Sequence, residues 1–134
     1  MQTIVVGYDG SEPANRALDR ATKLVDDGGT VVLVSAVHLL AGKGGMGFDP
    51  VEKEDFDRQL DTAKSRLVEQ GIAATTVEGL GDPARVITEQ AKESGADLIV
   101  VGNGHKNLLE RLLFGSVSDG VSHRTNCDVL VVDR

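Results

Sequence analysis

Four short runs of mostly β-branched apolar residues constrain the fold of this chain more than any other feature. They are Ile4–Val6, Val31–Val34, Leu98–Val101 and Val129–Val132. Short, continuous apolar runs are typical of strands that are buried on both faces, as in a parallel sheet. A fifth and more polar segment, Ala73–Glu78, predicts a strand at the edge of that sheet.

Helical patterns lie between these runs, with capping residues or proline before them and glycine behind them. The first carries an apolar stripe from Ala14 to Val25. We expect three helices that begin after Ser11, near Asp49-Pro50 and after Asp82, and that end before Gly28, Gly71 and Gly95. We expect a last short helix over residues 117–124, with Val117 and Val121 facing inward.

Strands and helices therefore alternate along the whole chain. Such alternation predicts right-handed crossovers and a doubly wound parallel sheet. The predicted fold class is α/β: one five-stranded parallel sheet of order 3-2-1-4-5 with helices on both faces. With 134 residues, the chain is expected to form a single domain over residues 1–134.

Charge and composition exclude several classes of function. The formal net charge is −7, and no basic stripe offsets it, so a nucleic-acid partner is not expected. No apolar run approaches the roughly 18 residues of a membrane span, and no signal peptide is recognised. The single cysteine, Cys127, fits a reducing compartment, so we expect a cytoplasmic protein without a membrane partner.

Two turns that follow predicted strands are candidates for a binding site. In open α/β sheets, ligands bind outside the carboxyl ends of the strands, where the strand order reverses. Gly7–Ser11 follows the first strand, and Gly102–His105 follows the fourth. Further along, Gly115–Ser118 combines glycine with two hydroxyls at the expected start of the last helix. Free amides at a helix start bind anions, so this segment is the best candidate for a phosphate site.

These segments resemble the universal stress protein family. Its nucleotide-binding members carry G-x2-G-x9-G-[ST] after the fourth strand, and Gly102 and Gly115-Ser116 match that spacing. Val5–Ser11 resembles the opening strand of the family, and Cys127–Val132 resembles its closing strand. The resemblance covers nearly the whole chain. It implies a regulatory module of the stress response that binds an adenine nucleotide, namely ATP, AMP or cyclic AMP, with or without Mg²⁺.

One position departs from the motif of the family. The second glycine should fall at position 105, where this chain has His105, and glycine occurs one residue earlier, as Gly104. Three interpretations remain open. Gly104 takes the conformationally permissive role, the site is impaired, or the imidazole of His105 faces the phosphates.

The resemblance also implies which residues bind the nucleotide. Asp9 would accept a hydrogen bond from the adenine or ribose, Ala36 would offer backbone groups near the base, and the amides of the last helix would bind phosphates. The implied site comprises Gly7, Asp9, Ala36, Val101, Gly102, Gly104, His105, Gly115, Ser116, Val117 and Ser118.

Simpler interpretations stand beside these. Asp9 can be a turn residue only, and Gly115-Ser116 can be a helix start with a capping hydroxyl. Gly42–Gly47 matches G-x-G-x-x-G, but it lacks the tight strand-to-helix turn that a dinucleotide site requires. A loop over the site is the preferred interpretation of that segment.

Three functions compete at this point. A binding module is preferred to an enzyme, because a slow ATPase would need a base that orients water and carboxylates that hold Mg²⁺. A nucleotide-free stress protein that acts through protein contacts is the third. The apolar run at residues 129–132 would lie at a sheet edge, so we expect it to pair with its own copy in a homodimer.

Overall fold

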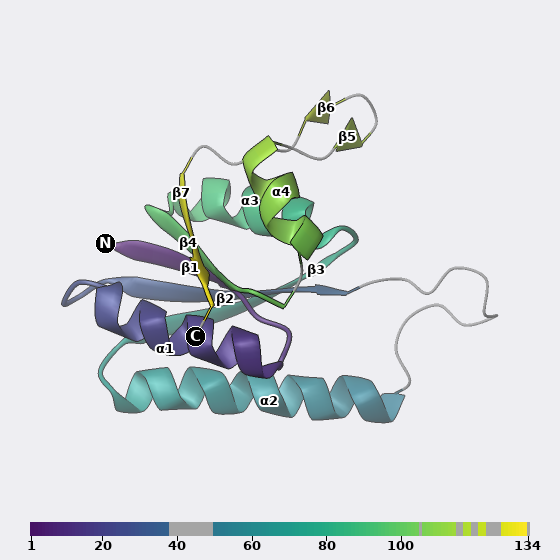
Figure 1. The fold of residues 1–134 in the computed structure, drawn as a ribbon. Coiled ribbons are helices and arrows are strands. Elements are labelled where there is room, and N and C mark those ends of the chain that lie inside the picture. The colour runs from purple at the N-terminus through teal and green to yellow at the C-terminus, as the bar shows by residue number, and fades with distance from the viewer. Residues whose placement is uncertain (38–49, 105, 115–116, 119–120, 123–126, 134) are drawn as a thin grey trace.

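A computed structural model describes residues 1–37, 50–104, 106–114, 117–118, 121–122 and 127–133, shown in Figure 1. The strands are β1 (Thr3–Gly7), β2 (Thr30–Val37), β3 (Ala73–Leu80), β4 (Leu98–Gly102), β5 (Val117–Ser118), β6 (Val121–Ser122) and β7 (Asp128–Val132). The helices are α1 (Glu12–Leu24), α2 (Pro50–Glu69), α3 (Pro83–Ser94) and α4 (Lys106–Phe114). No helix in these ranges is both long and apolar enough to span a membrane.

Five strands form a parallel sheet in the order β3-β2-β1-β4-β7. This order confirms the predicted fold class. The central strand β1 pairs with β2 on one side and with β4 on the other, so that Ile4 lies between Val31 and Leu98. The chain runs outward from β1 to β3 and then returns to β4, and the strand order therefore reverses between β1 and β4.

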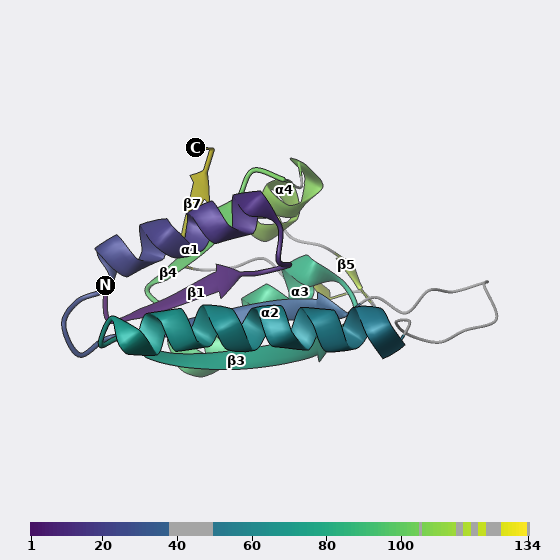
Figure 2. The same cartoon turned by 90° about the horizontal axis from the view of Figure 1, so that it is seen from below.

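Side chains that alternate along the strands build two cores. On one face, α1 and α2 cover Ile4 and Val6, both of which are fully buried (Figures 1 and 2). On the other face, α3 and α4 cover Val5 and Ile99. Since both faces are covered, the central strands can be apolar at every position, which is why they appear in the sequence as unbroken runs.

Local capping explains the helix boundaries. Ser11 Oγ accepts a hydrogen bond from the Ala14 amide at 3.3 Å, and Asp82 Oδ2 accepts one from the Arg85 amide at 3.3 Å. Gly95 ends α3 in the left-handed conformation, with φ 64°. The predicted starts and ends of α3 are confirmed, and α1 ends at Leu24, a few residues before Gly28.

The predicted last helix is wrong. Val117–Ser118 pairs in antiparallel fashion with Val121–Ser122, and the helix of this region is α4, earlier in the chain. In the sequence, Asp-Gly between two Val-Ser pairs favours a hairpin over a helix. The earlier helix α4 is favoured by an apolar pair at helical spacing, Leu108 and Leu112, whose exposed fractions are 7% and 0%. The Gly42–Gly47 segment lies outside the described residues.

Candidate functional site

A cavity of about 500 Å³ opens at the carboxyl ends of β1, β2 and β4, where the strand order reverses. It is bounded by the start of α1 on one side and by α3 and α4 on the other. Its volume lies in the range typical of small-molecule sites, roughly 300–1,000 Å³. The lining residues are Gly7, Tyr8, Asp9, Ser11, Pro13, Ala14, Val34, Ala36, Pro83, Ile87, Val101, Gly102, Gly104, Leu108 and Arg111.

Six of the residues expected at the nucleotide site line this one cavity: Gly7, Asp9, Ala36, Val101, Gly102 and Gly104. They come from β1, β2 and β4 or from the turns that follow β1 and β4. His105, Gly115 and Ser116 lie outside the described residues. Val117 and Ser118 form β5, so the expectation that they open a helix is wrong, and their contact with a phosphate stays a prediction.

Packing requires one of the cavity glycines, Gly102, and a second, Gly7, lies close to a flexible side chain. A Cβ atom on Gly102 would lie 2.4 Å from the carbonyl oxygen of Pro13, which is backbone. A Cβ atom on Gly7 would lie 2.9 Å from Ile87 Cδ1. The end of β4 therefore approaches α1 more closely than a side chain would permit, and the two glycines leave bare backbone at the cavity floor.

Gly104 does not play the permissive role that the sequence suggested. The described glycines with positive φ are Gly10, Gly28, Gly71, Gly81 and Gly95. Gly104 is absent from this group, and a Cβ atom there would meet Pro13 Cγ at an ordinary 3.4 Å. A shifted glycine therefore does not account for the substitution at position 105.

The carboxylate of Asp9 is held by Ser11. Asp9 Oδ1 accepts hydrogen bonds from the Ser11 amide at 2.9 Å and from the Ser11 hydroxyl. The same hydroxyl caps α1 through Ala14. Asp9 thus has the turn role that the sequence left open. A carboxylate offers about four acceptor sites, so this role is compatible with binding a ligand as well.

Tyr8 forms a fixed wall of the cavity beside Asp9. Its amide donates to Val34 O at 2.8 Å, its carbonyl accepts from the buried Ser35 hydroxyl at 2.9 Å, and its own hydroxyl donates to Asn15 Oδ1 at 2.8 Å. Burial raises the pKa of Tyr8 above its ordinary value, an effect that Arg66 opposes and Asp9 reinforces. Tyr8 is therefore a neutral hydrogen-bonded wall at physiological pH.

Sequence reasoning missed Arg111. This residue of α4 lines the cavity, and its Nη1 lies 2.7 Å from Asp82 Oδ1, at the start of α3. The signal that could have found it is the Leu108–Leu112 spacing, because a helix drawn through those two residues places Arg111 on an adjacent face. Without α4 in the prediction, nothing directed attention to this arginine.

The described residues offer little for a metal ion. They contain no group of three or more His, Cys, Asp or Glu side chains that could hold one. Asp9 is the only carboxylate among the described residues that line the cavity. Mg²⁺ is usually held by one or two carboxylates together with substrate phosphates and water, so these residues do not form a magnesium site of their own.

Comparison with known proteins points in one direction. The model of the universal stress protein family matches residues 1–133. Universal stress protein YxiE of Bacillus subtilis is 33% identical over an alignment of 144 positions, gaps included, which covers 96% of this chain and 97% of that protein.

Solved structures agree with the sequence relatives. A universal stress protein family member from Burkholderia pseudomallei is 31% identical, with 98% of this chain and 95% of the other covered and a TM-score of 0.73. A universal stress protein solved in complex with cAMP is 30% identical, with 98% and 97% covered and a TM-score of 0.67. Since sequence and fold match along nearly its whole length, the chain belongs to the universal stress protein family.

Proposed function

We propose that this protein is a cytoplasmic regulatory module of the stress response, a single domain over residues 1–134 that binds an adenine nucleotide in the cavity at the carboxyl ends of β1, β2 and β4. The observation that carries the proposal is the convergence of six expected site residues on one cavity. The related structure in complex with cAMP supports the same ligand class.

Each side of the cavity suits a different part of a nucleotide. Val34 and Ala36 give β2 a small apolar wall against which a flat base can pack, and the fixed Asp9 carboxylate offers acceptors to an amino or hydroxyl group. Gly7 and Gly102 expose backbone at the cavity floor, where a ligand can approach closely.

Binding is tested first on the unaltered protein. A ligand that binds only the native state raises Tm, so ATP, ADP, AMP and cyclic AMP are each expected to stabilise the protein at saturation if they occupy the cavity. Calorimetry then gives Kd for each nucleotide. If none of them changes Tm or produces heat at millimolar concentration, the proposal is wrong and the nucleotide-free alternative replaces it.

The position of the ligand is tested with a pair of variants. Asp9→Asn keeps an oxygen that can accept from Ser11 but removes the charge at the cavity, and it is expected to weaken ATP binding several-fold. Asp61→Asn removes the same charge from an exposed position of α2 and serves as the control. Equal Kd values for the two variants would place the nucleotide elsewhere.

We also propose that two copies pair through β7. Among the described strands, β7 is at an edge of the main sheet and pairs only with β4. Its central residues Val129, Leu130 and Val131 are partly exposed although apolar. Antiparallel pairing with the same strand of a second copy would cover them and satisfy the free edge.

Sedimentation equilibrium tests this pairing. We expect a dimer at micromolar concentration and a monomer for Val131→Pro, which removes a backbone donor from the edge strand. Circular dichroism establishes that the variant is folded. A monomeric parent protein would refute the dimer, and a folded Val131→Pro dimer would move the interface to another surface.

A further inference from the structure

The cavity contains one charged pair that the glycine motif does not explain. Arg111 Nη1 and Asp82 Oδ1 are 2.7 Å apart, and their side chains are 40% and 28% exposed. The pair joins α4 to the residue that caps α3, and Arg111 itself lines the cavity. Among the described lining residues, Arg111 is the only cation.

The guanidinium is only partly used by this pair. Arg111 Nε is buried and has no hydrogen-bond partner among the residues that the structure describes. An arginine carries five N–H donors in a planar fork that matches the oxygens of phosphate and carboxylate. Nε itself is shielded from a ligand, and the ion pair uses Nη1, so the other terminal nitrogen, Nη2, is the group that can donate to an anion at the cavity.

The overall charge makes this cation important for an anionic ligand. The chain carries a formal net charge of −7, which repels a nucleotide with several negative charges. A positive group within the cavity would favour phosphorylated over unphosphorylated adenine ligands, and Arg111 of α4 is such a group.

We propose that Arg111 is the phosphate-recognition residue of the cavity and that Asp82 holds its guanidinium in position while competing with the phosphate for it. This inference rests on the proposed nucleotide binding and adds that Arg111 makes the cavity prefer phosphorylated ligands. Affinity should rise with the number of phosphates through Arg111, and Asp82 should lower that affinity because its charge repels the incoming anion.

The experiment measures Kd by calorimetry for adenosine, AMP and ATP in the parent and three variants. Arg111→Gln should weaken ATP binding roughly ten- to hundredfold, the range for losing hydrogen bonds to a charged group, while adenosine binding changes less than about twofold. Arg111→Lys keeps the charge without the fork and should give an intermediate loss for ATP. Arg58→Gln, which removes an exposed arginine of α2 that pairs with Asp55, is the matched control and should bind as the parent does.

Asp82→Asn tests the second half of the proposal. Asparagine retains the capping oxygen of α3, so the helix start is preserved while the charge beside Arg111 is lost. ATP affinity should increase a few-fold, and adenosine affinity should stay constant. A merely structural ion pair would instead lower Tm in both Arg111→Gln and Asp82→Asn without changing the dependence on phosphate number.

The outcomes separate this inference from the proposed function. Equal ATP binding by the parent and Arg111→Gln would overturn the inference and leave nucleotide binding intact. Equal losses for adenosine and ATP would also overturn it, because Arg111 would then only shape the cavity. A parent protein that binds none of the three ligands would refute the proposed function and this inference together.

Discussion

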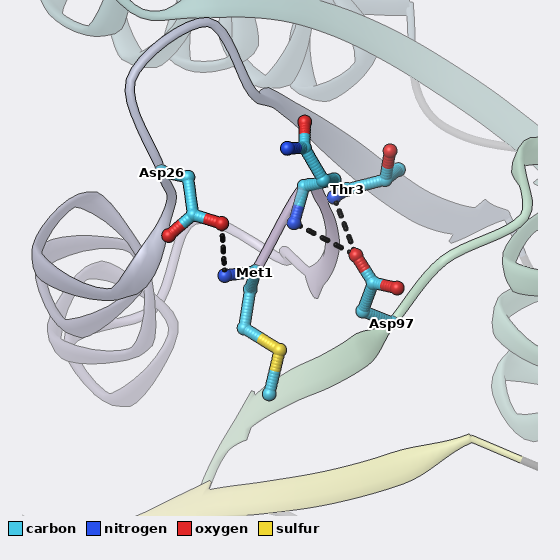
Figure 3. A network of polar contacts seen from close by, with 5 residues as sticks. Met1, Thr3, Asp26 and Asp97 are labelled. Carbon is cyan, nitrogen blue, oxygen red and sulfur yellow. Dashed lines mark hydrogen bonds and ion pairs between the residues drawn. The ribbon is translucent and has the colours of Figure 1, made fainter.

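The two ends of the parallel sheet are built from the same strands but in opposite ways. At the amino end, polar groups are paired with one another. Asp97 Oδ2 accepts from the Gln2 amide at 2.7 Å and the Thr3 amide at 3.0 Å, and the terminal ammonium of Met1 lies 2.8 Å from Asp26 (Figure 3). At the carboxyl end, glycines, an exposed carboxylate and one arginine surround a cavity.

The contrast separates stability from binding. At the amino end, backbone hydrogen bonds continue between neighbouring strands. The Asp97 amide donates to Thr3 O at 2.9 Å, and the Thr30 amide donates to Gln2 O at 2.8 Å. The carboxyl end leaves polar groups at an open surface, where a ligand can use them. Changes at the amino end should therefore alter stability alone, and changes at the carboxyl end should alter ligand binding.

The largest expected effect is on both stability and ligand binding, because the cavity residue Gly102 is also needed for packing. Gly102→Ala would place a Cβ atom 2.4 Å from Pro13 O, so β4 and α1 must move apart. Overpacking of this kind costs about 1–3 kcal/mol, and the shift should also weaken nucleotide binding. Denaturant unfolding and calorimetry measure the two effects.

Gly104→Ala is the matched control for Gly102→Ala. It alters the same segment of the cavity lining, but its Cβ atom would meet only ordinary contacts, at 3.4 Å or more. Its stability should stay within about 0.5 kcal/mol of the parent, as for substitutions away from such close contacts. If both alanine variants are equally stable, the close approach of Gly102 to Pro13 is not a constraint.

A smaller effect sharpens the comparison at the amino end. Hydrogen bonds from Thr3 and Gln2 lower the pKa of Asp97. Since its folded pKa lies below the unfolded value, the carboxylate stabilises the fold above its ordinary pKa, and this contribution is lost as pH falls through the lowered one. Asp97→Asn should lower Tm near neutral pH, and the gap to the parent should narrow in acid.

Nucleotide binding by Asp97→Asn should equal that of the parent, as measured by calorimetry. Asp27→Asn removes the same charge from an exposed turn at this end and controls for net charge. A Tm gap between Asp97→Asn and the parent that stays constant from neutral pH into acid would contradict the assigned role of the carboxylate.

The smallest effect concerns Tyr8, at the carboxyl end. Tyr8→Phe removes the hydrogen bond to Asn15 and should cost about 1 kcal/mol. Because the folded pKa of Tyr8 is raised, its contribution is complete below the ordinary pKa and is lost as pH rises through the raised one. Unfolding curves from neutral to alkaline pH should therefore converge for the two proteins, and curves that remain parallel would contradict the assignment.

Local sequence patterns determined most of the elements and the position of the cavity. Unbroken β-branched runs predicted strands covered on both faces, and Ser11, Asp82 and Gly95 predicted helix ends through capping that involves only near neighbours. The alternation of elements then predicted the strand order, and the strand order predicted which edge of the sheet carries the cavity. These inferences succeed because their physical causes act within a few residues or follow from chain topology.

Only the tertiary structure decided the features that depend on contacts between distant segments. Gly102 must be glycine because Pro13 packs against it. Asp97, which is remote in the sequence, accepts a hydrogen bond from Thr3 at the start of β1, and Arg111 of α4 forms an ion pair with Asp82 at the start of α3. The prediction at residues 117–124 failed for a related reason: short segments carry too little local preference to choose between helix and hairpin, and packing of Leu108 and Leu112 favoured an earlier helix. Each of these contacts forms only when the sheet brings remote residues together, so no local pattern could reveal it.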